Sequence, residues 1–305
     1  MSSADRLVVV VGPTASGKSD LGIALAGRLG PAEIVNADSM QLYRGMDIGT
    51  AKTPPDQRGG VPHHLLDVLD VADPGSVAEF QRMARATIAD CQRRGVTPIV
   101  VGGSALYVRA GIDPLDFPGT NADVRARWTA ELEKQGAPAL HAVLAERDPD
   151  AAEQILPSNG RRIVRALEVG ELTGEPFVAS MPGHESEYPG LVMIGLDVPR
   201  NVLDERLERR VEEMWENGFV DEVKSMIATG LEDGPTASRA LGYQQILAHL
   251  RVETTSEDEA RAATITGTRK FARRQDRLFR KDPRIHWLRF DSPTLVNDAV
   301  RIVTS

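Results

Sequence analysis

Residues 12–19 read Gly12, Pro13, Thr14, Ala15, Ser16, Gly17, Lys18 and Ser19, or GPTASGKS. This run matches the phosphate-loop pattern G-x-x-x-x-G-K-[ST] at every fixed position. The apolar run Leu7 to Val11 before it predicts a buried strand, and residues 20–29 after it predict a helix. A strand, a glycine turn and a helix N-terminus in this order indicate a cradle for phosphate groups.

Each part of this loop has a physical task. Gly12 and Gly17 let the backbone curl so that successive N–H groups face one anion, and Lys18 adds a full positive charge. The hydroxyl of Ser19 is placed to hold Mg²⁺ against phosphate oxygens. The alternative is a glycine-rich turn with a surface lysine, but the strand and the helix beside it favour the phosphate loop. ATP-binding and other nucleotide-binding proteins share the motif, so it does not identify the phosphates.

Composition limits the class of protein. The 305 residues are 41% apolar and 26% charged, which is ordinary for a globular protein, and this length favours two domains. Cys91 is the single cysteine, which excludes an internal disulfide. The sequence contains no apolar run long enough to span a membrane and no signal peptide, so we expect a cytoplasmic protein without a membrane partner.

The order of elements predicts an α/β fold, with a parallel sheet of the phosphate-loop type flanked by helices. Further buried strands are predicted over Glu33 to Val35, Thr97 to Val101 and Leu191 to Leu196. Residues 115–190 contain helical patterns without a convincing strand. We therefore predict a catalytic core of residues 1–114 and 191–305, interrupted by an all-helical insertion domain over residues 115–190.

Polar side chains follow two of the predicted strands. Asp38 comes after the strand that ends near Val35, and Ser104 follows Gly102 and Gly103 at the end of another. The carboxyl ends of parallel strands share one rim, so these side chains should face the same crevice as the phosphate loop. An alternative for Asp38 is a capping role for a helix over residues 40–44.

Two adjacent histidines precede the run Leu65 to Val71, which is a possible edge strand. His63 and His64 point in different directions, and no third ligand stands at a usable spacing in the sequence. This pattern favours a structural or substrate-contact role over a metal site.

Positive charge is concentrated near the C-terminus. Residues 261–289 carry ten lysines and arginines against Asp276 and Asp282, within a chain of net charge −8. A second basic group, Arg161 to Arg165, lies on a predicted helix of the insertion. Both patterns indicate a polyanion such as nucleic acid, although solvated helix faces are the alternative.

Several classes of enzyme place a phosphate loop after the first strand: nucleotide kinases, nucleotide-driven motors, and transferases that hold a diphosphate leaving group. Motors need an aspartate at the end of an apolar strand to order Mg²⁺, whereas the strand Thr97 to Val101 ends in glycines. A kinase with a helical lid, a transferase and a non-catalytic RNA-binding protein remain open at this point.

Six motifs in order resemble those of the tRNA dimethylallyltransferase family. They are GPTASGKS, NADSMQLYRGMDIGTAK, PHHLLD, GGSALYVRA, RRIVRALE and ALGYQQ, and the resemblance extends from about Val8 to Trp287. It implies transfer of a dimethylallyl group from dimethylallyl diphosphate to N6 of the adenosine 3′ of the tRNA anticodon, with release of diphosphate and a requirement for Mg²⁺. Ser19 and Ser104 stand where threonine is also frequent in the family, and both keep the hydroxyl group.

The resemblance also implies roles for single residues. Residues 12–19 bind the diphosphate, with Ser19 toward Mg²⁺, while Asp38, Thr14 and Arg210 are catalytic. The tRNA contacts are Asp38, Ser39, Met40, Gln41, Ser104, Arg161, Arg162, Ile163, Val164 and Arg165. The insertion is then expected to bind the anticodon stem-loop, and we expect the protein to be a monomer.

Overall fold

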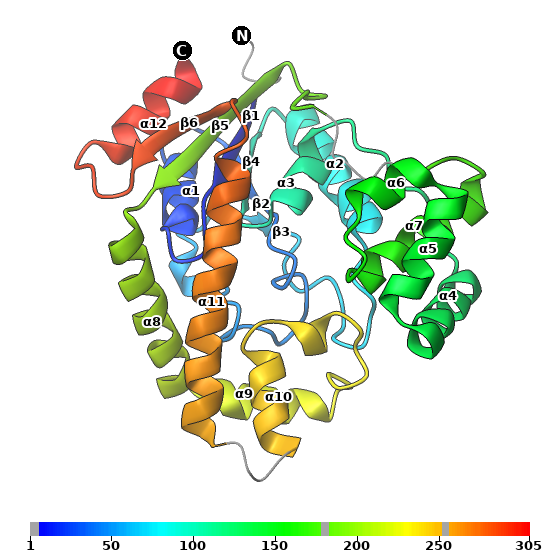
Figure 1. The fold of residues 1–305 in the computed structure, drawn as a ribbon. Coiled ribbons are helices and arrows are strands. Elements are labelled where there is room, and N and C mark those ends of the chain that lie inside the picture. The colour runs from blue at the N-terminus through cyan, green and yellow to red at the C-terminus, as the bar shows by residue number, and fades with distance from the viewer. Residues whose placement is uncertain (1–5, 178–182, 252–255) are drawn as a thin grey trace. The chain divides into compact units, whose positions relative to one another are not determined.

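The computed structural model describes residues 6–177, 183–251 and 256–305 (Figure 1). Six parallel strands form one sheet in the order β3-β2-β4-β1-β5-β6. The strands are β1 (Arg6–Val11), β2 (Ala32–Asn36), β3 (His63–His64), β4 (Thr97–Gly102), β5 (Gly190–Asp197) and β6 (Ile285–Arg289). The fold predicted from the sequence is confirmed, and the phosphate loop follows the central strand β1.

Helices flank this sheet and continue beyond its carboxyl ends. They are α1 (Lys18–Ala26), α2 (Val77–Arg93), α3 (Ala105–Ile112), α8 (Arg200–Glu216), α9 (Phe219–Ile227), α10 (Tyr243–Arg251), α11 (Glu257–Phe279) and α12 (Leu295–Thr304). Short 3-10 helices occur at Pro55–Gln57 and Ala237–Arg239. Within the described part of the chain, every helix is too short or too polar to cross a membrane.

The chain divides into two compact units, residues 1–114 with 184–305, and residues 115–183. The second unit holds α4 (Ala122–Gln135), α5 (Ala137–Arg147), α6 (Pro149–Gln154) and α7 (Gly160–Thr173) around its own apolar core. Residues 184–190, which the sequence analysis assigned to the insertion, belong to the first unit. The reason is local, because the N–H of Glu187 donates to the carbonyl of Ile112 at 3.1 Å.

Among the apolar clusters of the described residues, two large ones hold the first unit together. One joins β1, β4 and β5 to α1 and α12, with Val8, Ile99 and Ile194 fully buried. The other surrounds Phe219, whose ring meets Trp215 and Tyr243 edge-on at 5.3 and 4.9 Å. This second cluster fixes α8, α9 and α10 against the loop after β2, which is the loop that enters the site.

Two possibilities that the sequence left open are wrong, and two elements were not predicted. The possible edge strand over Leu65 to Val71 does not form. Residues 65–67 are a bend, in which Leu65 and Asp67 have left-handed φ angles of 59° and 57°, and Leu69 forms an isolated parallel bridge with Tyr43. Residues 40–44, considered as a capped helix, form turns. The strand β6 and the helix α12 were not predicted. The strand has only five residues and directly follows a charged run, so its apolar pattern is weak.

Candidate active site

The phosphate loop has the backbone shape that its glycines predict. Gly17 takes a left-handed conformation with φ of 95° and precedes α1 directly, so the first N–H groups of the helix are not capped by a side chain. Ala15 also has a positive φ of 63°. A helix start of this kind presents N–H donors and partial positive charge to an anion.

Two cations stand beside the loop. Burial lowers the pKa of Lys18 to about 8, although the nearby charge of Asp38 acts in the opposite direction. Burial also lowers the pKa of Arg210, on α8, and its Nη1 donates to the hydroxyl of Thr14 at 3.2 Å. Cations that lose solvation in this way favour an anionic ligand, because a bound negative charge replaces the lost water.

Asp38 follows β2 and is held by short-range hydrogen bonds. Its N–H donates to the side chain of Asn36 at 3.0 Å, and its own Oδ1 accepts the N–H of Met40 at 3.0 Å. The carboxylate therefore stabilises a turn rather than the helix that the sequence allowed. It lies close enough to Lys18 and Arg210 to influence the pKa of both.

Gln275, which the sequence analysis missed, joins α11 to the phosphate loop. Its Oε1 accepts the N–H of Thr14 at 2.9 Å, and its Nε2 donates to the carbonyl of Gly103 at 2.8 Å. The side chain is buried, with 5% exposure, so both bonds are shielded from water. Nothing in the charged sequence around Gln275 marks it, because its partners lie more than 170 residues away in the chain.

Glu222, on α9, holds the loop that follows β2. Its carboxylate accepts the N–H groups of residues 47, 48 and 49 at 3.1, 2.7 and 3.2 Å, together with the hydroxyl of Tyr243 at 2.6 Å. Lys52 holds the other end of this loop through the carbonyl of Tyr43 at 3.0 Å. Thr50 and Ala51, between these anchors, are thereby fixed in the walls of the site.

The site consists of three adjoining cavities. A small central cavity of about 40 Å³ is lined by Thr14, Lys18, Ser19, Asp38 and Arg210 among others. A larger loop-side cavity of about 620 Å³ shares Lys18, Ser19 and Arg210 with it. A helix-side cavity of about 610 Å³ shares Thr14, Asp38 and Arg210. The three predicted catalytic residues therefore lie together, between two open cavities.

The helix-side cavity gathers three more of the predicted residues and several that were not predicted. Ser39, Met40 and Ser104 line it, whereas Gln41 lines the central cavity. Its other walls come from distant segments, namely Phe219, residues 239–244 and one side of α11. The motif ALGYQQ, at residues 240–245, contributes four of these lining residues.

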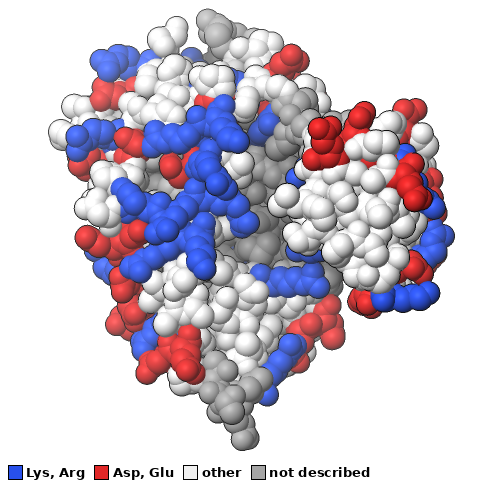
Figure 2. Space-filling model, in the orientation of Figure 1, with Lys and Arg blue, Asp and Glu red and all other residues white. Residues whose placement is uncertain are grey.

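The basic residues of α11 divide into two faces, and Figure 2 shows lysine and arginine gathered over this helix. One face is paired with α8, where Arg261, Arg269 and Arg273 meet Glu212, Glu208 and Asp204 at 3.1, 2.6 and 3.4 Å. The other face has Lys270, Arg274 and Arg277, which line the helix-side cavity and form no ion pair within residues 6–177, 183–251 and 256–305. Part of the positive charge of α11 is therefore used in ion pairs with α8, and part faces the helix-side cavity.

The predicted basic group of the insertion is also mixed. Ile163 and Val164 are buried in the apolar core of that unit, while Arg161 and Arg162 are exposed. Arg165 donates to the carbonyl of Pro118 at 2.6 Å and to the buried carboxylate of Glu168 at 2.9 Å. Arg165 thus helps to hold the insertion together, and the assignment of residues 161–165 to tRNA binding stays a prediction.

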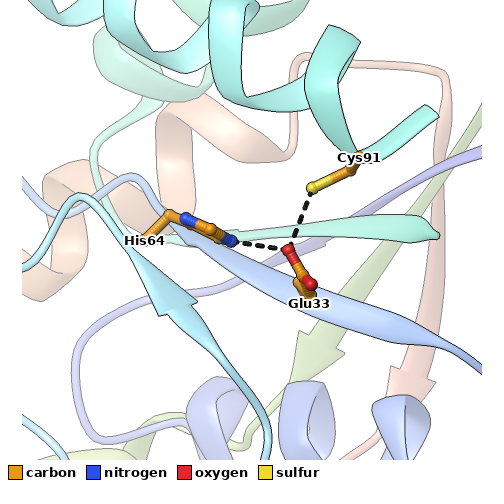
Figure 3. Close-up of side chains that lie close together, drawn as sticks. All are labelled: Glu33, His64 and Cys91. Carbon is orange, nitrogen blue, oxygen red and sulfur yellow. Dashed lines mark hydrogen bonds and ion pairs between the residues drawn. The ribbon is translucent and has the colours of Figure 1, made fainter. Parts of the chain in front are cut away.

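His64 lies in a hydrogen-bonded cluster at the start of β2 (Figure 3). Its Nε2 is 2.7 Å from a carboxylate oxygen of Glu33, which also accepts the thiol of Cys91 at 3.4 Å and the guanidinium of Arg94 at 2.6 Å. The bond from Arg94 lowers the pKa of Glu33 to about 2, and burial raises the pKa of the Cys91 thiol to about 11. A protonated thiol and a paired carboxylate indicate a structural role. His63 lines the central cavity.

Comparison with known proteins agrees with this geometry. Residues 41–282 match the family described as IPP transferase. The chain is 61% identical over 301 residues to a tRNA dimethylallyltransferase of Thermobifida fusca. The matched region covers 97% of this chain and 94% of the relative. It is 63% identical over 285 residues to one of Streptomyces avermitilis, which covers 93% and 90%.

Solved structures give the same result. A tRNA isopentenylpyrophosphate transferase from Bacillus halodurans has a TM-score of 0.73 at 38% identity, covering 98% of this chain and 96% of that chain. A eukaryotic dimethylallyltransferase acting on tRNA has a TM-score of 0.80 at 27% identity, covering 98% and 77%. The similarity spans both compact units.

Proposed function

Because the chain belongs to the tRNA dimethylallyltransferase family, we propose that it transfers a dimethylallyl group from dimethylallyl diphosphate to N6 of the adenosine 3′ of the tRNA anticodon. In this reaction the bond between the allylic carbon and the diphosphate oxygen breaks, and its electron pair leaves with the diphosphate. The same carbon forms a bond to N6, which loses one proton.

The observation that carries this proposal is the central cavity. It adjoins a loop-side cavity that is lined by part of the phosphate loop, and a helix-side cavity that is lined by Asp38 and by Lys270, Arg274 and Arg277 of α11. Two substrates can therefore approach from different sides and meet at Thr14 and Asp38. Transfer of a prenyl group from a diphosphate to a nucleoside fits this arrangement, because the two substrates must meet at the carbon atom that is transferred.

The loop-side residues stabilise the leaving group. As the carbon–oxygen bond breaks, negative charge grows on the diphosphate, and the N–H groups before and within the first turn of α1 face it. Lys18 and Arg210 add two positive charges that are already partly desolvated. Donors fixed in place before the reaction stabilise the developing charge without reorganisation. Gln275 and Arg210 position Thr14 between the two substrates.

The residues present also suit Mg²⁺. Ser19 offers a hydroxyl oxygen in the first turn of α1, and it lines both the central and the loop-side cavities. Mg²⁺ prefers oxygen ligands and usually takes few of them from the protein, keeping water and phosphate oxygens for the rest. When bound, the ion would supply positive charge to the departing diphosphate.

Asp38 is the group that accepts the proton. The exocyclic amine of adenine is a poor nucleophile, because its lone pair is conjugated with the ring. A carboxylate that accepts a hydrogen bond from N6 raises the electron density on nitrogen and takes the proton as the new bond forms. The hydrogen bond from Met40 holds the carboxylate in place for this task.

The RNA partner is the tRNA anticodon stem-loop. Lys270, Arg274 and Arg277 supply positive charge at the helix-side cavity, and the exposed Arg161 and Arg162 supply it on the insertion. The reacting adenosine must leave its stack to reach the central cavity, as enzymes that modify a base generally require. In this proposal the protein acts as a monomer in the cytoplasm.

The test is mass spectrometry of nucleosides from tRNA incubated with the protein, dimethylallyl diphosphate and Mg²⁺. We expect one adenosine per substrate tRNA, 3′ of the anticodon, to gain the mass of a dimethylallyl group. Parallel incubations contain ATP in place of the prenyl donor, or the Asp38→Asn variant. Transfer of phosphate from ATP without prenylation would contradict the proposal and support a kinase.

A further inference from the structure

Phe271 is an exposed aromatic side chain on α11. It is 36% exposed, whereas the neighbouring Ala272 and Gln275 are buried at 1% and 5%. The large apolar side chains exposed in the described part of the chain are otherwise leucines. The exposed part of the phenylalanine ring is available to a ligand, because it is not covered by the protein itself.

The surroundings of Phe271 are those of a site for single-stranded nucleic acid. The ring lines the helix-side cavity beside Lys270, Arg274 and Arg277. The guanidinium carbon of Arg274, one turn further along the helix, lies 5.5 Å from the centre of the ring. Proteins bind unstacked bases on aromatic rings and guanidinium planes, with nearby cations for the phosphates.

Phe271 does not line the central cavity, where the three predicted catalytic residues lie. Gln275 contacts Thr14 at the central cavity, and Phe271 lies four residues before it, about 6 Å along the axis of an α-helix. The reacting adenine must place N6 at Asp38. Asp38 and Phe271 line the same helix-side cavity, so a nucleotide next to that adenosine would be within this cavity too.

We propose that Phe271, with Arg274 beside it, stacks on a nucleobase that directly flanks the reacting adenosine. This inference rests on the proposed function, because it assumes that RNA enters the helix-side cavity. Flipping one nucleotide disrupts stacking for its neighbours, and the phenylalanine ring would replace the lost stacking partner. The chemical identity of the flanking base would matter little for this contact, because every base has a π-face.

The test is a binding cycle between Phe271→Leu and abasic RNA. Leucine retains apolar volume but removes the ring. We expect this variant to bind an unmodified anticodon stem-loop about tenfold more weakly, within the range found for stacked bases. Two further stem-loops carry an abasic nucleotide, one on the 5′ side and the other on the 3′ side of the adenosine. For one of these two RNAs, Phe271→Leu should reduce the affinity less than twofold. Phe271→Trp should bind like the wild type.

Controls separate this contact from packing and from the other substrate. Leu278, on the same helix, is 45% exposed and does not line the described cavities, so Leu278→Ala should leave RNA binding unchanged. The melting temperature and the affinity for dimethylallyl diphosphate should not change in Phe271→Leu. An equal loss for all three RNAs, or a loss of affinity for dimethylallyl diphosphate, would overturn the proposal. Absence of prenylation by the wild type would instead contradict the proposed function.

Discussion

The loop-side and helix-side cavities share Arg210 and adjoin the same central cavity, yet they are built differently. The phosphate loop is one continuous run whose backbone shape follows from its own glycines. The helix-side cavity is assembled from segments near residues 38, 104, 219, 240 and 270. The phosphate loop keeps its shape through its own backbone conformation, whereas the helix-side cavity depends on how the helices around it pack.

The largest effect should come from the residue at the boundary between the two cavities. Asp38→Asn retains an oxygen that can accept the N–H of Met40, but it cannot take a proton. We expect kcat to fall about 10²–10⁴-fold, the usual contribution of a general base, while the affinity for tRNA stays within a few-fold. Single-turnover kinetics and RNA binding measure the two separately. Equal losses in both would assign Asp38 to binding.

Lys18→Met tests the loop side. We expect transfer to fall about 10²–10³-fold, as for removal of one donor to a developing anion, with tRNA affinity unchanged. The free variant should be more stable than the wild type at pH 7, because methionine removes a charge whose burial is unfavourable. Thermal unfolding without ligands measures this gain.

The pH dependence of that gain follows from the pKa of Lys18, which is lowered from 10.5 to about 8. Between these two values the unfolded wild-type chain binds more protons than the folded one, so its free energy of unfolding rises with pH. The stability advantage of Lys18→Met should therefore shrink as the pH is raised from 8 toward 10.5. An advantage that does not change with pH would mean that methionine stabilises the loop by packing.

Gln275→Ala tests whether α11, which lines the helix-side cavity, positions the phosphate loop. The variant removes both the acceptor for Thr14 and the donor to Gly103. We expect kcat to fall by about tenfold, since a small misplacement of a catalytic group is costly. Gln275→Glu keeps an acceptor for Thr14 and should retain more activity than alanine. A change confined to the KM for tRNA would show that Gln275 only binds RNA.

The same contrast explains what the sequence could predict. The phosphate loop, Asp38 and Ser104 follow directly from strands and motifs, because parallel strands bring their carboxyl ends to one rim. Gln275 and Glu222 had no such signal, since each forms hydrogen bonds across more than 170 residues of chain. Their roles depend on the packing around Phe219, which no local pattern reports.

The charge pattern of the sequence predicted only part of the RNA-facing surface. The sequence shows that α11 is basic, but it does not show which arginines face the carboxylates of α8. The helix repeat places residues 269 and 273 on one side and residues 270, 274 and 277 on another. The position of α8 beside α11 determines which arginines are in ion pairs and which are available to RNA, and the sequence does not show this position.

The smallest expected effect lies in the insertion, where two arginines one turn apart offer a matched pair. Arg161 is exposed, and Arg161→Ala should weaken tRNA binding a few-fold. The slope of log affinity against log salt should become about one unit shallower, as for the loss of one phosphate contact. The melting temperature should not change.

Arg165→Ala should show the opposite pattern. Arg165 donates to the carboxylate of Glu168, which is fully buried, and Arg125 would remain as its charged partner. We expect the insertion to lose about 1–3 kcal/mol of unfolding free energy, the cost of an unsatisfied buried group. Below the unfolding temperature the salt slope should stay as in the wild type. If Arg165→Ala changed the slope and Arg161→Ala did not, the contact with RNA would lie at Arg165, and the exposed start of α7 would not bind tRNA.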